Sequence, residues 1–172
     1  MTERGALITG ACGTGKSSVV EEIAELLERG ELSYAAIDLD WLMWFDADVD
    51  DATRDRVFLA NLRAMVSNYR EAGVERFVMA GSIPDDATVT AIRAAVPVPL
   101  RVVRFSLPLA EIEARLGTAV TVGRADDLRV ARQWIAAATG VGIENVVIDN
   151  DRPIRDTALE ILAWLGWDNL SK

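Results

Sequence analysis

The chain of 172 residues contains no histidine, a single cysteine and only two lysines, Lys16 and Lys172. Without histidine, a general base has to be a carboxylate, and a metal site built from imidazole groups is excluded. The lone cysteine, Cys12, excludes an intramolecular disulfide and a zinc site made of several thiolates. Because lysine is so scarce, Lys16 cannot be treated as one of many interchangeable surface lysines.

Long apolar runs and clusters of basic residues are missing as well. No stretch approaches the ~20 apolar residues that span a bilayer, and the first residues show no signal-peptide pattern, so we expect a cytoplasmic protein without a membrane partner. The 27 acidic residues outnumber the 18 basic ones and give a net charge of −9, which argues against a nucleic-acid partner. With 51% apolar residues the chain can bury a core, and its length indicates one domain over residues 1–172.

A phosphate-binding motif is present near the start of the chain. Gly10 is followed by four residues and then by Gly15-Lys16-Ser17, which matches the P-loop pattern G-x-x-x-x-G-K-[ST]. The glycines permit the backbone geometry in which successive N–H groups point at phosphate oxygens. Lys16 is expected to reach the β- and γ-phosphates, and the Ser17 hydroxyl to bind Mg²⁺. The residues predicted to contact the nucleotide here are Gly10, Ala11, Cys12, Gly13, Thr14, Gly15, Lys16, Ser17 and Ser18.

The sequence around this motif has the order strand, loop and helix that a P-loop requires. Residues 6–8 form a short apolar run typical of a buried strand, and apolar residues recur at helical spacing after the motif. Gly30 then occupies the position of a glycine at a helix C-terminus. The sequence therefore predicts that the protein binds a nucleoside triphosphate.

Four more apolar segments of strand length follow, with helical patterns between and after them. The expected strands cover residues 32–38, 76–80, 100–107 and 145–149, and the expected helices 52–72, 84–95, 109–116, 126–138 and 151 onward. Strands alternating with helices predict a parallel sheet covered on both faces, that is, a three-layer α/β/α domain. Ligands bind such sheets beyond the carboxyl ends of the strands. The P-loop should therefore share one crevice with the residues that follow each strand.

Two acids, Asp38 and Asp40, come at the end of the second expected strand. Phosphoryl transfer needs a metal partner for the β- and γ-phosphates and a carboxylate that orients or deprotonates the attacking hydroxyl. Two acids at i and i+2 beside a P-loop can divide these two tasks. The alternative interpretation is an ordinary acidic strand end in an acidic protein.

Together these features resemble the small-molecule kinases of the adenylate-kinase-like superfamily. The P-loop, the D-x-D pair, the small-residue turn at Gly81 and a short arginine-bearing segment at about 117–125 are similar to those of shikimate, gluconate and adenylylsulfate kinases and of chloramphenicol phosphotransferase. The resemblance implies a five-stranded sheet in the order 2-3-1-4-5, a short lid at about 117–125, and an ATP- and Mg²⁺-dependent kinase acting on a hydroxyl group of a small molecule.

The resemblance also implies roles for single residues. Asp38 would hold Mg²⁺, Asp40 would act as the base toward the acceptor hydroxyl, and Gly81 would face the substrate. Four further residues would serve the nucleotide or its phosphates. Arg115 would pack on the adenine, Arg124 in the lid would close on the phosphates, and Arg152 and Pro153 would pass the adenine ring.

Two further absences narrow the class of nucleotide enzyme. The strand at 76–80 lacks the terminal acid that many motor-type ATPases carry, and the guanine-reading pattern N-K-x-D does not occur. ATP is therefore the expected nucleotide. Two rivals stay open at this point. One is a kinase whose acceptor is a nucleotide, a nucleotide sugar or a polynucleotide 5′ end, and the other is a nucleotide-binding switch or partner-regulated ATPase without a small-molecule acceptor.

The acceptor site is expected in the segment after Asp40 and on the helix at 52–72. The candidate residues are Trp41, Trp44, Arg56, Asn61 and Gly81. Aromatic walls suit a partly apolar acceptor such as an antibiotic, a nucleoside or a sugar derivative. The alternatives are that the aromatic residues pack the helix against the sheet and that the arginines form a solvated helix face. A monomer or a homodimer is expected.

Overall fold

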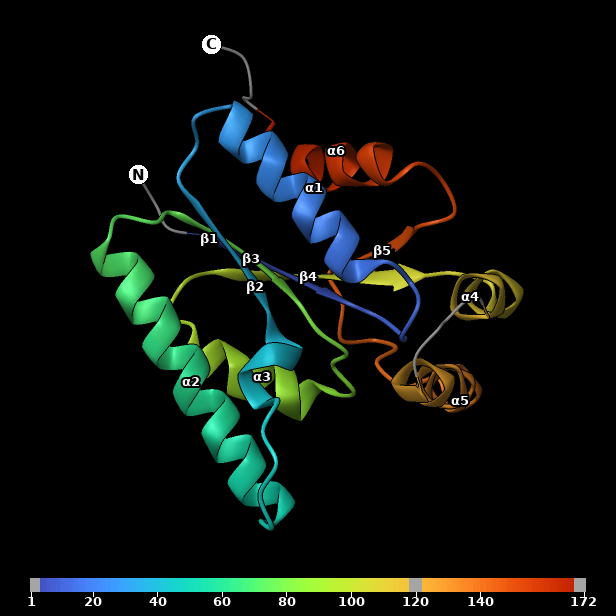
Figure 1. The fold of residues 1–172 in the computed structure, drawn as a ribbon. Helices are drawn as coiled ribbons and strands as arrows, with labels where there is room; N and C mark the ends of the chain where they lie inside the picture. The colour runs from blue at the N-terminus through green and yellow to red at the C-terminus, as the bar shows by residue number, and fades with distance from the viewer. Residues whose placement is uncertain (1–3, 118–121, 169–172) are drawn as a thin grey trace.

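The computed structural model describes residues 4–117 and 122–168, with residues 122–125 described by their backbone only. One five-stranded sheet is surrounded by helices (Figure 1). In chain order the elements are β1 (Arg4–Thr9), α1 (Lys16–Arg29), β2 (Tyr34–Asp38), the 3-10 helix η1 (Leu39–Met43), α2 (Asp51–Glu71), β3 (Arg76–Ala80), α3 (Asp86–Ala95), β4 (Leu100–Ser106), α4 (Leu109–Leu116), α5 (Val122–Ala136), β5 (Val146–Asp149) and α6 (Ile154–Leu165).

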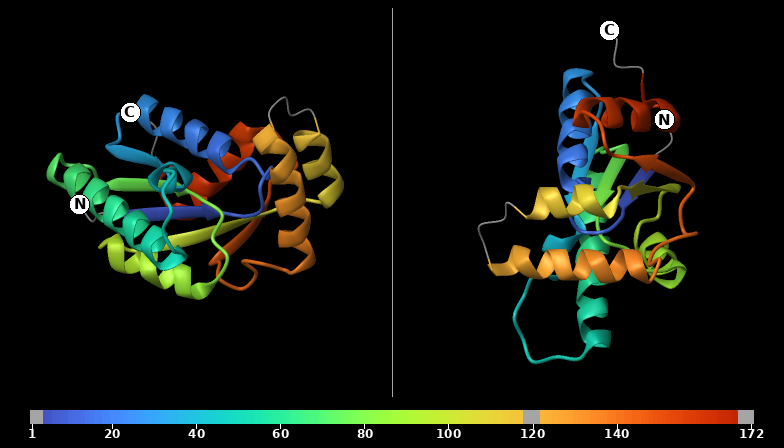
Figure 2. Two further views of the ribbon diagram at one scale, coloured as in Figure 1. Left: turned by 60° about the horizontal axis from the view of Figure 1, so that its bottom comes forward. Right: turned by 90° about the vertical axis from the view of Figure 1, so that its right-hand side faces the viewer.

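The strands lie in the order β2-β3-β1-β4-β5, and every neighbouring pair is parallel. β1 is the central strand, with Leu7 paired to Met79 on one side and to Val102 on the other. Helices α1 and α6 cover one face of the sheet, and α2 and α3 cover the other (Figures 1 and 2). The predicted three-layer fold and strand order are therefore confirmed.

The apolar run in β1 is divided between two cores. Ala6, Leu7 and Ile8 are all fully buried. Because successive side chains of a strand point to opposite faces, Ala6 and Ile8 pack against α1 and α6, whereas Leu7 packs with α2 and α3. A third, smaller cluster joins the P-loop to α4 and α5 through Ile112 and Ala131. The P-loop is thus also supported by apolar contacts with α4 and α5.

Two helices begin directly after an aspartate that caps them, and a third begins earlier than the sequence predicted. Asp50 caps α2 by accepting from Thr53 N, and Asp85 caps α3 by accepting from Thr88 N. α5 begins at Val122, earlier than the expected start at 126. The expectation treated Gly123 as a loop residue, but a glycine inside a helix costs only about 1 kcal/mol relative to alanine. The short segment η1 was not expected at all.

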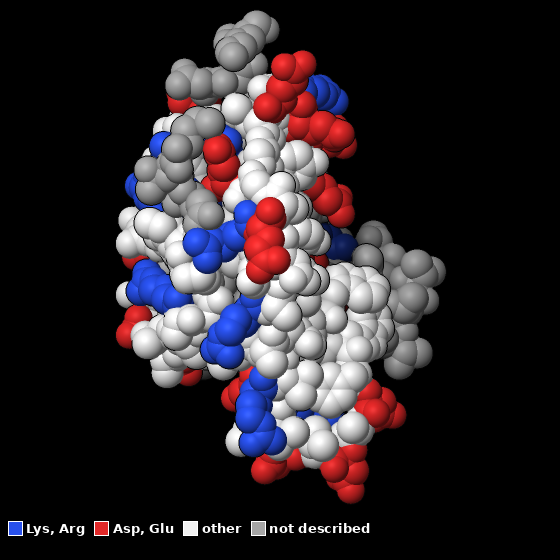
Figure 3. Space-filling model, turned by 90° about the vertical axis from the view of Figure 1, so that its left-hand side faces the viewer, with Lys and Arg blue, Asp and Glu red and all other residues white. Residues whose placement is uncertain are grey.

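Within residues 4–117 and 122–168, no helix combines the length and the apolar character required to cross a bilayer. The surface over α2 carries basic and acidic side chains interspersed with uncharged ones, without a continuous basic area on that face (Figure 3).

Two leucines of α6 provide a test of the core that lies above the sheet. Leu162 is fully buried, whereas Leu159 on the same helix is 39% exposed. We expect Leu162→Ala to lower the free energy of unfolding by about 2–5 kcal/mol, because it leaves a cavity beneath α6. Leu159→Ala should cost less than about 1 kcal/mol. Urea denaturation measures both, and equal losses would contradict the packing described.

Candidate active site

The P-loop connects β1 to α1 through three glycines with positive φ angles: 148° at Gly10, 80° at Gly13 and 87° at Gly15. Neighbouring side chains also leave no room for a Cβ atom at Gly13 and Gly15. A Cβ on Gly15 would lie 2.7 Å from Asn150 Nδ2, and one on Gly13 would lie 2.9 Å from Leu116 Cγ. The glycines of the motif are therefore required both by the backbone geometry and by the packing of neighbouring segments on the loop.

Lys16 starts α1, and its side chain is folded over the P-loop. Its Nζ donates to the carbonyl oxygens of Gly10 (2.9 Å) and Ala11 (3.0 Å). An ammonium group has three donors, so one N–H remains available to a ligand in the cavity. Burial lowers the pKa of Lys16, and the nearby carboxylates of Asp40 and Asp38 oppose that shift. The site therefore surrounds its one lysine with acids that favour the charged form.

Ser17 and Asp38 form an oxygen pair next to the loop. The Ser17 hydroxyl donates to Asp38 Oδ2 at 2.9 Å, and Asp38 Oδ1 accepts from Asp40 N at 3.0 Å. Mg²⁺ prefers oxygen ligands and is usually held by one or two carboxylates together with substrate phosphates. Among the described residues no three His, Cys, Asp or Glu side chains gather into a metal cluster. The Ser17–Asp38 pair has the donor chemistry of a site that is completed by phosphate oxygens.

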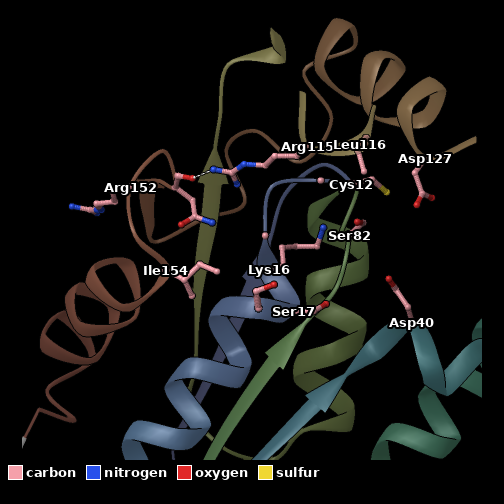
Figure 4. A pocket seen from close by; sticks show the side chains of 14 residues that line it. Cys12, Lys16, Ser17, Asp40, Ser82, Arg115, Leu116, Asp127, Arg152 and Ile154 are labelled. Atoms are coloured by element: carbon pink, nitrogen blue, oxygen red, sulfur yellow. Dashed lines mark hydrogen bonds between the residues drawn. The ribbon is translucent and has the colours of Figure 1, made fainter. Parts of the chain in front are cut away.

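The P-loop borders a cavity of about 660 Å³ in which charges are separated by sign. Arg115 and Arg152 lie to one side of Lys16, whereas Asp40 and Asp127 lie to the other (Figure 4). Burial, followed by the negative charge of Asp38, raises the pKa of Asp40, and Lys16 opposes the shift. Asp40 is thus a carboxylate of increased basicity facing the space in front of the P-loop.

Cys12 also lines this cavity and is partly exposed. Burial raises the pKa of its thiol, and the positive charge of Lys16 opposes that shift. A raised thiol pKa reduces the thiolate fraction at neutral pH, so the cysteine is not activated as a nucleophile.

Two of the arginines predicted for the nucleotide, Arg115 and Arg152, lie on the side of Lys16 away from Asp40 (Figure 4). Arg115 Nη2 donates to the carbonyl of Asn150 at 2.7 Å, which fixes the end of α4 against the segment after β5. Arg152 pairs with Glu160 and donates weakly to Thr157 Oγ1 at 3.4 Å, and Pro153 is the residue before α6. Arg115 and Arg152 both line the cavity. Arg124 falls within α5, but its side chain lies outside the described part of the structure, as do residues 118–121 of the expected lid.

Four of the predicted acceptor residues do not reach this cavity. Trp41 and Trp44 are 67% and 75% exposed, with their ring centroids 4.6 Å apart. The alternative that these two tryptophans pack α2 against the sheet is therefore wrong. Asn61 Nδ2 donates to the carbonyl of Leu42 at 2.8 Å and fastens η1 to α2, and Arg56 donates to Thr53 on its own helix. Trp41 and Asn61 border a separate hollow between η1 and α2.

Gly81 has a packing role beside Asp40. A Cβ at this position would come within 3.1 Å of the Leu39 side chain, so a larger residue would displace η1. The next residue, Ser82, donates to the carbonyl of Gly10 at 3.2 Å. The turn after β3 thus supports both the P-loop and the segment that carries Asp40.

Five residues that line the cavity were not among the predicted site residues: Ser82, Leu116, Asp127, Asn150 and Ile154. Asn150 is buried, donates to the Thr14 carbonyl at 2.7 Å and accepts from Thr157 Oγ1 at 2.8 Å. Its position directly after an apolar strand was an available signal. Asp127 lines the cavity from α5, and nothing in its sequence context distinguishes it from a solvated helix residue.

No family model matches the sequence, and no curated protein matches it. Several solved structures, by contrast, do match the chain. A sugar kinase from Janibacter sp. HTCC2649 is 16% identical, with a TM-score of 0.69 and coverage of 100% of this chain and 99% of that one. The APS kinase of Mycobacterium tuberculosis, solved with AMPPNP and APS, is 23% identical, with a TM-score of 0.63 and coverage of 96% and 98%. The chain has the fold of P-loop kinases.

Other P-loop kinase folds resemble it to a similar degree. The tunicamycin resistance protein of Deinococcus radiodurans is 19% identical, with a TM-score of 0.64 and coverage of 95% of this chain and 96% of that one. The likeness extends over the whole chain, so the P-loop kinase fold accounts for every described element.

Replacing Asn150 tests the support of the P-loop. Asn150→Ala leaves the Thr14 carbonyl and the Thr157 hydroxyl without their partner, which should lower the free energy of unfolding by about 1–3 kcal/mol. It should also weaken binding of an ATP analogue several-fold. The control is Asn145→Ala at the opposite end of β5, where Asn145 Oδ1 accepts from Val102 N at 2.8 Å. Calorimetry should show unchanged nucleotide affinity for that variant; equal affinity losses in both would contradict the assignment.

Proposed function

We propose that this protein is an ATP- and Mg²⁺-dependent phosphotransferase that moves the γ-phosphoryl group to a hydroxyl of a small molecule. The observation that carries the proposal is the position of Asp40. Its carboxylate lines the P-loop cavity and also a second cavity, of about 220 Å³, between η1, α2 and the turn after β3. A base between the donor space and a separate cavity for an acceptor is what phosphoryl transfer to a small molecule needs, whereas nucleotide hydrolysis needs room only for water.

The donor half of the reaction rests on the P-loop. Its N–H groups and the N-terminus of α1 favour the negative charge of a triphosphate, and the remaining donor of Lys16 would reach its terminal phosphates. Ser17 and Asp38 would hold Mg²⁺, which would supply positive charge to offset that of the phosphates. Arg115 and Arg152 would border the nucleotide at the other end. The fold shared with an APS kinase solved with AMPPNP supports ATP as the nucleotide.

The acceptor half rests on Asp40. An acceptor hydroxyl in the second cavity would place its oxygen beside this carboxylate. As that oxygen forms a bond to the γ-phosphorus, the bond between the γ-phosphorus and the oxygen bridging to the β-phosphate breaks. The hydroxyl proton passes to Asp40, and ADP leaves. In this scheme Lys16 stabilises the charge on the transferred group.

Asp40→Asn tests the role of the base. The amide cannot accept the proton, so we expect kcat to fall by about 10²–10⁴-fold while the affinity for the ATP analogue stays within a few-fold of the parent protein. The matched comparison is Asp127→Asn, which removes the same charge from α5 on the same side of the cavity and should reduce kcat by less than about tenfold. Coupled ADP-release assays and calorimetry give both values.

The two variants together discriminate between the carboxylates. If Asp127→Asn abolishes turnover and Asp40→Asn does not, the base is on α5 and the assignment is refuted. If neither variant changes turnover, the acceptor hydroxyl does not depend on a carboxylate of this cavity.

Ser17→Ala tests the metal site. Removing the hydroxyl that faces Asp38 Oδ2 should raise the Mg²⁺ concentration needed for half-maximal activity about tenfold, equivalent to about 1.4 kcal/mol of lost interaction. Ser18→Ala changes the neighbouring serine of the same cavity and should leave the Mg²⁺ requirement unchanged. Activity titrated with Mg²⁺ after treatment with a chelator measures the requirement, and identical curves for the two variants would exclude Ser17 as a ligand.

A further inference from the structure

The second cavity has acids on its polar side. Besides Asp40 and Ser82, which it shares with the P-loop cavity, it is lined by Asp55 from α2 and Thr88 from α3. Met43 and Phe58 contribute apolar walls. The cavity therefore offers two carboxylates and two hydroxyls above an apolar floor. In the part of the chain that the structure describes, no lysine or arginine lines it.

A neighbouring hollow is also lined by acids and not by basic side chains of the described residues. A shallower hollow of about 330 Å³ shares Asp55 and Thr88 with this cavity and adds the carboxylate of Asp85. Again no basic side chain of the described residues lines it. A molecule extending from Asp40 toward solvent would thus pass along a path bordered by Asp40, Asp55 and Asp85, which we call the acidic path.

The arginines closest in sequence are held away from the acidic path. Arg54 donates to the carbonyls of Phe45 (3.5 Å) and Ala47 (3.1 Å) and lies over the Phe45 ring. Arg56 donates to Thr53 Oγ1 at 2.9 Å. Among the described residues, the arginines that line the P-loop cavity, Arg115 and Arg152, lie on the other side of Lys16 from Asp40 (Figure 4). The positive charge that the site holds is therefore directed at phosphates, not at the acceptor.

We propose that the acceptor is a hydroxyl-bearing amine, such as an amino alcohol or an amino sugar; this rests on the proposed kinase function. Its hydroxyl would face Asp40, and its protonated amine would face Asp55. The Asp55 side chain is exposed and makes no ion pair or hydrogen bond with the other described residues, so it can pair with a ligand without breaking an existing polar contact. Opposite charges at short range in a partly enclosed cavity attract, and like charges repel.

The same arrangement disfavours an acceptor that carries a carboxylate, sulfate or phosphate. Such a group would enter the acidic path without a cation to compensate it, and it would also add to the negative charge of the nucleotide. Acid-bearing acceptors need arginines or lysines in the acceptor cavity, which the described residues do not supply. The charge of the cavity thus selects among hydroxyl compounds of similar size.

Two matched sets of compounds test this selection. In each set the carbon skeleton and hydroxyl groups are similar while the charge differs: serinol, glycerol and glycerate, and glucosamine, glucose and glucuronate. We expect phosphorylation of the amine to exceed that of the carboxylate by at least tenfold in kcat/KM, with the neutral compound between them. A preference for the carboxylate in both sets would overturn the inference.

Substitution of Asp55 tests the residue responsible. Asp55→Asn should reduce the preference for amine over carboxylate several-fold, and Asp55→Arg should reverse it. The control is Glu71→Gln, which removes the same charge at the opposite end of α2, where Glu71 is exposed. This control should leave the preference unchanged. If Glu71→Gln and Asp55→Asn shift the preference equally, the effect comes from overall charge, and the assignment of Asp55 is wrong.

A thermal-shift measurement separates failure of this inference from failure of the proposed function. A Mg²⁺-bound ATP analogue that binds the folded protein must raise its melting temperature. If it does not, the nucleotide function itself fails. If it does and carboxylates are the better acceptors, the kinase stands and the amine inference falls. If it does and no compound in either set is phosphorylated or adds a further shift, the amine inference falls together with the small-molecule acceptor.

Discussion

The P-loop is a segment whose backbone N–H groups have to point inward, and the rest of the structure depends on holding it in that form. Its three glycines adopt positive φ angles, a conformation that does not stabilise itself. Contacts from different parts of the chain fix it: Asn150 donates to Thr14, Ser82 donates to Gly10, and Lys16 donates to Gly10 and Ala11. The loop is thus assembled at the carboxyl ends of β1, β3 and β5, where a parallel sheet brings distant residues together.

Charge separation within the active site follows from the same geometry. The carboxyl end of β2 delivers Asp38 and Asp40 on one side of the P-loop, while α4 and the segment after β5 deliver Arg115 and Arg152 on the other. Lys16 lies between the two groups (Figure 4). Burial lowers its pKa, and the acids counteract that effect. Under the proposed function, this placement would direct the positive charge of the described residues at the phosphates and leave the acceptor side negative.

The fold was predictable from sequence because short apolar strands alternating with helices allow few architectures, and the P-loop fixes the first strand–helix unit. The donor site was predictable for the same reason. The acceptor side was not: Asn61 holds η1 instead of lining the active site, and Trp41 and Trp44 are exposed. The two tryptophans follow Asp40 closely in the sequence, but they lie in and directly after the 3-10 helix η1, which the sequence did not predict, and both are exposed to solvent. Asp55 and Asp127 reach the site from helices whose exposed faces carry many acids, so no pattern distinguished them.

This difference reflects how the two halves of the site are built. The centre of the proposed donor half is the P-loop, whose residues are adjacent in sequence and whose roles depend on backbone geometry that few side chains permit. The acceptor half combines η1, the first turns of α2 and the N-terminus of α3, which the sheet only positions. Asp55 in particular can change without disturbing the P-loop, because its side chain makes no hydrogen bond or ion pair with another described residue. A kinase fold can therefore keep one nucleotide site and alter acceptor charge through a few residues at helix ends, which is why acceptor specificity has to be derived from the cavity and not from the motif.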